Sequence, residues 1–161
     1  MISILLAATA IAPLTKTWEV VDGVYDGAQT CGISQVYADG TRFLIAVDER
    51  DAARNQFSLL AFNEDWSIAE GERLGDISIL TETKTFGSMA RSGPGLFIIG
   101  SFLDRMSEAL RAAASSGFTI RITERKKEIG PYSPIGLPAA VDKLEACLKR
   151  RFPKPDDPFA R

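Results

Sequence analysis

Three carboxylates stand close together in the chain, at Asp48, Glu49 and Asp51. A pair of carboxyl groups can hydrolyse a glycosidic bond, because one protonates the leaving oxygen while the other acts as base or nucleophile. Arg50 and Arg54 alternate with these acids and neutralise them. Since charged loops of this kind are common, we interpret the segment as a solvated loop. A hydrolase that uses these carboxylates or a Ser–Lys pair is the alternative.

The 161-residue chain contains no histidine, the usual general base near neutral pH and the commonest metal ligand. Ser-His-Asp and Cys-His nucleophiles and His-based zinc sites are therefore excluded within this chain. Two cysteines do not complete a four-thiolate zinc site or hold an iron–sulfur cluster. We accordingly predict no catalytic residue, no metal and no cofactor.

A basic run is the first candidate binding surface, and it consists of Arg121, Arg125, Lys126 and Lys127. Such a run can hold an anion or an acidic partner surface. Acidic residues flank it, so an exposed hairpin tip is the alternative. Trp66 is a second candidate for a ligand surface, although tryptophans more often pack in the core. The 19 basic and 21 acidic residues give a net charge of -2, which argues against a nucleic-acid partner.

The two cysteines, Cys31 and Cys147, are widely separated along the chain. Cys147 shares the apolar face of the last predicted helix with Val141 and Leu144, so it points toward the core. An even count of cysteines favours one disulfide that joins the start of the fold to this helix. The alternative is a cytosolic structural protein with two buried free thiols.

Residues 2–12 form an apolar run of the length of a signal-peptide core. The run contains two small-x-small sites, which end at Ala10 and Ala12, and Pro13 hinders cleavage at the second. We therefore predict a signal peptide within residues 1–12, cleavage after Ala10, and a periplasmic or secreted protein. No Lys or Arg precedes the run, so an N-terminal strand of a cytosolic protein is the alternative. No segment is long enough to predict a transmembrane helix.

The rest of the chain predicts one α+β domain over residues 13–152 and a Pro-rich extended tail over 153–161. Strands are expected where short apolar or β-branched runs lie between turn residues, at 18–25, 31–37, 41–48, 57–62, 66–75, 77–80, 96–100 and 118–122. Two helices in the C-terminal half, from Leu103 to Gly117 and from Pro138, should pack on a mostly antiparallel sheet. The third strand is apolar on both faces, so we expect it to be central and covered on both sides.

Several short segments carry a resemblance to known proteins. They are Trp18-x-Val20, Cys31, Phe57-Ser58-Leu59, Trp66-Ser67-Ile68 and the ending Gly136-Leu137-Pro138-Ala139-Ala140 through Leu144 and Cys147. In these the chain resembles small exported bacterial proteins with a β-rich body and a final cysteine-bearing helix. That group has no known catalytic residues to transfer. The sequence thus favours a non-enzymatic exported domain that binds a protein or cell-envelope partner, an inhibitor or immunity-type role included.

Overall fold

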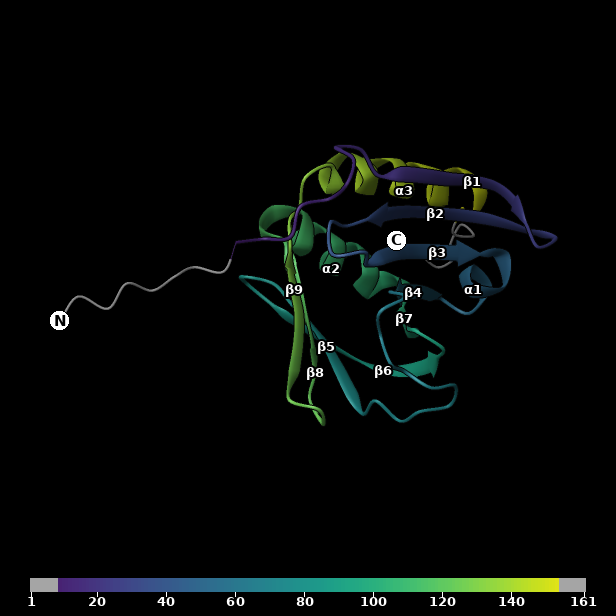
Figure 1. Ribbon diagram of the computed structural model, residues 1–161. Helices are drawn as coiled ribbons and strands as arrows, with labels where there is room; N and C mark the ends of the chain where they lie inside the picture. The colour runs from purple at the N-terminus through teal and green to yellow at the C-terminus, as the bar shows by residue number, and fades with distance from the viewer. Residues whose placement is uncertain (1–8, 154–161) are drawn as a thin grey trace.

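The computed structural model describes residues 9–153, apart from the side chains of residues 87–91, 101, 102 and 104. Nine antiparallel strands form one curved sheet in the order β1-β2-β3-β4-β7-β6-β5-β8-β9 (Figure 1). The strands are β1 Glu19–Tyr25, β2 Ala28–Val36, β3 Arg42–Asp48, β4 Gln56–Phe62, β5 Asp76–Leu80, β6 Thr85–Gly93, β7 Leu96–Phe102, β8 Phe118–Ile122 and β9 Lys127–Tyr132. The described helices are α1 Glu49–Ala53, α2 Leu103–Ser116 and α3 Leu137–Arg151.

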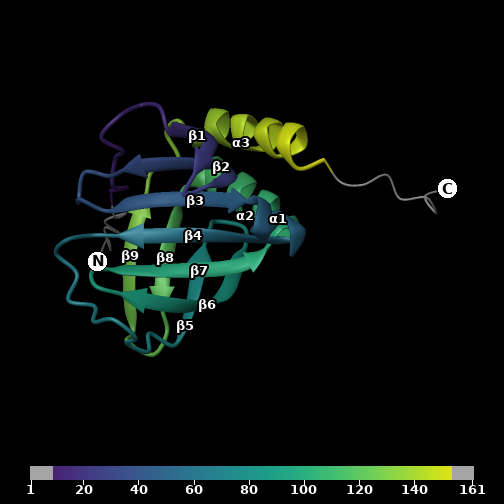
Figure 2. The ribbon, with the colours of Figure 1, turned by 90° about the vertical axis from the view of Figure 1, so that its right-hand side faces the viewer.

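The predicted α+β class, with two helices from the C-terminal half packed on a mostly antiparallel sheet, is confirmed. Strand alternation explains the packing, because every second side chain points to the same face. Ile33 of β2 lies opposite Ile45 of β3, which lies opposite Leu59 of β4, and all three are buried. This inner face packs against Met106 and other apolar residues of α2, and α2 and α3 lie on the same side of the strands (Figure 2).

The residues before β1 connect the far edge of the curled sheet to the end of β2. The Ile11 N–H donates to the Pro131 carbonyl at 2.7 Å, and the Ile11 carbonyl accepts from Ser133 N at 2.9 Å. The Ala12 carbonyl accepts from Ala38 N at 2.9 Å. The segment thus forms main-chain hydrogen bonds both with the end of β9 and with the residues that follow β2.

Local turn signals predict the connections well. Asp26 and Gly27 have φ values of 50° and 74° and join β1 to β2 as a hairpin, the turn that an Asp-Gly pair between two apolar runs favours. Gly117 has a φ of 81° and its N–H donates to the Ala113 carbonyl, so it ends α2 as predicted. Pro131 lies in β9, which is an edge strand as its lack of an N–H requires.

Two local expectations are wrong, and one strand was not predicted. The segment after β3, expected to be a loop, contains α1, because the Asp48 side chain accepts hydrogen bonds from the first-turn amides. Residues 66–75, expected to include a strand, have no regular structure. Strand β6 was not predicted, because its sequence TFGSMARSG combines two glycines with no apolar alternation.

Strand β3 is central, as predicted, but the structure covers only one of its faces with helices. Its inner residues pack beneath α2, whereas Leu44 and Ala46 lie on the outer face and are half-buried. Both α2 and α3 belong to the inner side, since α2 contacts Ile45 and the Cys147 of α3 contacts Cys31. Within residues 9–153 no helix covers the outer face of β3, contrary to the expectation of cover on both faces.

Cys31 of β2 and Cys147 of α3 are placed together as predicted. Their sulfur atoms are 2.02 Å apart and their Cα atoms 5.9 Å apart, within the range of a disulfide. Both residues are buried, at 0% and 2% exposure. The pair connects the second strand to the last helix across 116 positions of sequence.

Removing this connection should destabilise the fold. In the chain-entropy model a loop of this length contributes roughly 4–5 kcal/mol, and Cys147→Ala should lower the free energy of unfolding by about 2–5 kcal/mol in urea titrations. Cys31→Ala/Cys147→Ala is the matched control, since reductant should change wild-type stability and leave this variant unchanged. Alkylation of two thiols in freshly isolated, unreduced protein contradicts the bond.

Candidate functional site

The predicted basic run extends from β8 through the turn to the first residue of β9, and its charges do not converge on one site. Arg121 pairs with Glu128 across the two strands at 2.6 Å, and Arg125 pairs with Glu72 of the loop before β5. Among the described residues, Lys126 and Lys127 have no ion-pair partner. Two of the four cations are thus neutralised within the chain, and two face solvent.

A shallow hollow of about 220 Å³ lies beside Arg121, between the β8–β9 hairpin and the end of α2. Thr81, Glu82 and Ser116 line it together with the Arg121–Glu128 pair. The Ser116 hydroxyl accepts from the Glu82 N–H at 3.2 Å. The Arg121 guanidinium is paired with Glu128, and the Ser116 hydroxyl is engaged by the main chain. Among the described residues the Glu82 carboxylate has no ion-pair partner, so the hollow does not combine free cationic and polar groups that would recognise a particular ligand.

Trp66 packs on the body of the protein rather than standing free. Its ring stacks on Phe97 of β7 with centroids 5.4 Å apart and an interplanar angle of 10°. Phe97 is fully buried and Trp66 is half-buried. Trp66 therefore packs against the core, which was the alternative to a ligand surface. None of its described contacts is with the basic run.

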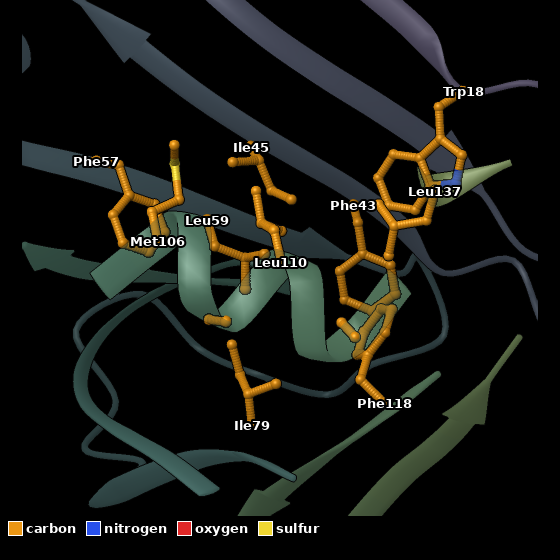
Figure 3. Close-up of a pocket in the computed structure, with 12 residues that line it drawn as sticks. Trp18, Phe43, Ile45, Phe57, Leu59, Ile79, Met106, Leu110, Phe118 and Leu137 are labelled. Atoms are coloured by element: carbon orange, nitrogen blue, oxygen red, sulfur yellow. The ribbon is translucent and has the colours of Figure 1, made fainter. Parts of the chain in front are cut away.

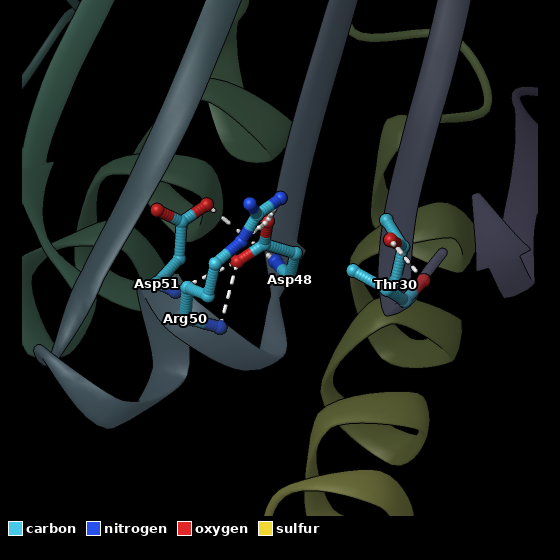
Figure 4. A network of polar contacts seen from close by, with 5 residues as sticks. Thr30, Asp48, Arg50 and Asp51 are labelled. Carbon is cyan, nitrogen blue, oxygen red and sulfur yellow. Dashed lines mark hydrogen bonds and ion pairs between the residues drawn. The ribbon is translucent and has the colours of Figure 1, made fainter. Parts of the chain in front are cut away.

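The acidic cluster is a helix cap (Figure 4). Asp48 Oδ1 accepts hydrogen bonds from the N–H groups of Arg50 and Asp51, each at 2.8 Å. The Arg50 guanidinium donates to Asp48 Oδ2 at 2.9 Å, and the Asp51 carboxylate accepts from Asp48 N at 3.5 Å. Thr30, on the neighbouring strand, turns its hydroxyl to the Ala28 carbonyl at 3.2 Å and stays outside the network.

The two capping carboxyl groups have pKa values displaced in opposite directions. Burial alone raises the pKa of Asp48, but hydrogen bonds from Asp51 N and Arg50 outweigh it and hold that pKa below its usual value. Burial raises the pKa of Asp51, and the hydrogen bond from Asp48 N opposes it only in part. Opposite shifts suit an acid–base pair, but here both carboxyl groups are engaged in closing the first turn of α1.

A small apolar cavity lies between α2 and the inner face of the sheet (Figure 3). Its volume is about 30 Å³, far below the several hundred Å³ of typical small-molecule sites. Phe43, Leu59, Met106, Leu110 and Phe118 are among its lining residues. With no polar side chain beyond the Trp18 indole to orient a ligand, the cavity is an imperfection in the packing beneath α2.

The outer face of the sheet carries a row of apolar side chains that the sequence analysis did not single out. Leu44 of β3 lies opposite Leu60 of β4, and Leu60 lies opposite Ile98 of β7. All three are half-buried although α2 lies behind their strands (Figure 2). The available signal was that β3, β4 and β7 are apolar on both faces, a pattern typical of doubly covered strands.

The free end of the β1–β2 hairpin is the second exposed apolar feature. Val24 is 62% exposed and Tyr25 is 54% exposed, and they end β1, an edge strand of the sheet. Leu14 and Ile135, the other large apolar side chains that are more than half exposed among those described, lie elsewhere, outside the strands. Nothing in the local sequence distinguishes Val24 and Tyr25 from the half-buried residues of a strand.

Comparison with known proteins identifies no relative of this chain. No protein-family description, curated protein or solved structure matches the chain. Within residues 9–153, no group of three or more Cys, Asp or Glu side chains is arranged to hold a metal ion. No helix in the described part of the chain is long and apolar enough to cross a membrane.

The capping role of Asp48 predicts a graded response to substitution. Asp48→Ala should lower the free energy of unfolding by about 0.5–2 kcal/mol, whereas Asp48→Asn, which can still cap, should cost little near neutral pH. Because the pKa of Asp48 is lowered on folding, its carboxylate stabilises the fold above the unfolded pKa of about 3.9. That contribution is lost as the pH falls through the folded value.

Urea titrations near neutral pH and at about pH 3, below the unfolded pKa of aspartate, measure this effect. Asp48→Asn should show a smaller loss of stability in acid than the wild type. Exposed Glu49 provides the matched control, and Glu49→Gln should follow the wild type at both pH values. Equal acid sensitivity of wild type and Asp48→Asn would contradict the assignment.

Proposed function

We propose that the protein is an exported, non-enzymatic domain that binds a protein partner along the free edge of β1. The observation that carries the proposal is the exposed pair Val24 and Tyr25 at the end of this edge strand. An edge strand presents main-chain N–H and C=O groups that an added strand can pair. Tyrosine is enriched among the residues that dominate binding energy at protein interfaces.

The charges around β1 define the chemistry of the partner. Glu19, Asp22 and Asp26 are the charged residues of the strand and its turn, and all are acidic. Asp22 already contacts Arg150 and Arg151 of α3, the latter at 2.5 Å. Glu19 and Asp26 have no ion-pair partner among the described residues. The edge therefore suits an extended segment with apolar and basic side chains, and it disfavours an acidic one.

Export is supported by the way the residues after Ala10 fit the fold. Thr9 and Ala10 are exposed, whereas Ile11 is half-buried and forms two main-chain hydrogen bonds with the β9 end of the sheet. Cleavage after Ala10 keeps these bonds, and the new amino group at Ile11 donates to the same Pro131 carbonyl. Cleavage after Ala12 removes them. A disulfide between Cys31 and Cys147 also belongs to an oxidising compartment.

The edge-binding proposal predicts a position-dependent loss of binding. Photo-crosslinking from position 24 in the native host should trap a partner, and crosslinking from position 14 should not. Val24→Ser/Tyr25→Ser should reduce binding of the trapped partner by tenfold or more, because a partly buried aromatic anchor contributes about 1.4 kcal/mol or more. Leu14→Ser/Ile135→Ser removes equally exposed apolar groups and should leave binding unchanged.

Hydrogen exchange identifies the mode of contact. Partner binding should slow exchange of the β1 amides that face away from β2, since those groups gain main-chain hydrogen bonds. Unchanged exchange along β1 together with full binding by Val24→Ser/Tyr25→Ser would exclude this edge as the binding surface.

The processing proposal predicts a mature chain that begins at Ile11. N-terminal sequencing of protein recovered from the native host measures the start, and intact Met1 in a cytosolic fraction would contradict export. Purified chains that begin at Ile11 and at Pro13 provide a matched pair. The shorter chain should be less stable by about 3 kcal/mol, since it loses three main-chain hydrogen bonds of about 1 kcal/mol each.

A further inference from the structure

We infer that the outer face of strands β2, β3, β4 and β7 is a self-association surface, on which two copies of the chain stack face to face about a two-fold axis. This surface is separate from the β1 edge, so the inference goes beyond the proposed binding function. Its starting point is the half-buried apolar row Leu44, Leu60 and Ile98, which the described helices leave uncovered (Figure 2). We name this row the ridge.

A second row of the same face has the opposite shape. Ala46 lies opposite Gly32 and Ser58, and Ser58 lies opposite Gly100. This small-residue row runs parallel to the ridge, two positions away along each strand, which is about 7 Å. Because one row has large side chains and the other has small ones, the face has a raised ridge beside a shallow groove.

A two-fold axis parallel to the two rows, and midway between them, makes the face complementary to itself. The rotation places Leu44 of one copy over Ala46 of the other, Leu60 over Ser58, and Ile98 over Gly100. Facing sheets pack about 10 Å apart with interdigitated side chains. In an isologous interface each such contact occurs twice, so both ridges are covered in one step.

Charge identifies the second copy as the occupant. Arg42 lies two positions before Leu44, and Asp48 lies two positions after Ala46, so both belong to the outer face at opposite ends of β3. The same rotation places Arg42 of each copy opposite Asp48 of the other. Arg42 is exposed and has no ion-pair partner among the described residues, and the Asp48 side chain remains 21% exposed beside Arg50.

Analytical ultracentrifugation of the full chain tests the inference. The wild type should sediment as a dimer at about 100 μM, a concentration at which even weak association is detectable. Leu60→Arg should raise the dissociation constant at least about tenfold, because it buries a charge in the ridge contact. The matched control is Leu80→Arg, the same change at a half-buried outer-face position of β5 outside the ridge, and it should leave the dimer intact.

Two further variants distinguish complementary shape and charge from non-specific hydrophobic association. Ser58→Leu makes the face more apolar but fills the small-residue row, so it should weaken the dimer at least about tenfold. Arg42→Glu should also weaken it, and more strongly at low salt, by opposing the Asp48 carboxylate. A wild type that stays monomeric at about 100 μM, or a Ser58→Leu chain that associates as well as the wild type, would overturn the inference. Partner crosslinking at position 24 should persist in Leu60→Arg, which separates this result from the edge-binding proposal.

Discussion

One-sided cover of the sheet is the constraint on which the rest of this structure depends. Helices α2 and α3 both pack on the inner face, where Ile33, Ile45 and Leu59 are buried in successive strands. The Cys31–Cys147 pair attaches the last helix to that same face. Since the described helices that bury apolar surface are on the inner side, the apolar side chains of the outer face have no partner within the described chain.

The acidic residues of this protein show how a motif can resemble chemistry and perform a structural role. Asp48 and Asp51 have opposite pKa displacements, which is the arrangement expected of a general acid and base. Their hydrogen bonds, however, run to each other's main chain and to Arg50. A capping box uses a carboxylate because its ionised oxygens accept strong hydrogen bonds from main-chain amides, whereas a catalytic pair uses carboxyl groups to transfer a proton or to attack as a nucleophile. The donors distinguish a cap from a catalytic pair, and here the donors are main-chain N–H groups and Arg50.

Features that depend on local chemistry were predictable from the sequence. The Asp26-Gly27 hairpin, the Gly117 helix end and the confinement of Pro131 to an edge strand each follow from backbone rules that operate over a few residues. The α+β class and the apolar face that carries Cys147 follow from periodicity. Strand β6 was missed because its partners β5 and β7, rather than its own propensity, determine that it is a strand.

The candidate surfaces were harder to predict because they depend on which side chains the tertiary structure pairs or covers and which it leaves exposed. An apolar pattern on both faces of β3 is typical of a strand covered on both sides, but within the described residues the helices α2 and α3 pack on the inner face only. Likewise, Arg121 and Arg125 look available in sequence, and only the fold shows that Glu128 and Glu72 approach them. Exposure of Val24 and Tyr25 arises from the position of β1 at the sheet edge, which is a property of strand order.

The two inferred surfaces are compatible, and together they have a consequence that neither has alone. An axis that runs across the strands preserves each strand's position along that axis, so the β1 edges of the two copies come to the same side of the stacked sheets. Their Tyr25 ends point in opposite directions. A partner with two suitable extended segments can then pair with both edges, and the second contact is intramolecular. In the proposed dimer two β1 edges face one partner, so avidity adds to the contact that each edge makes alone.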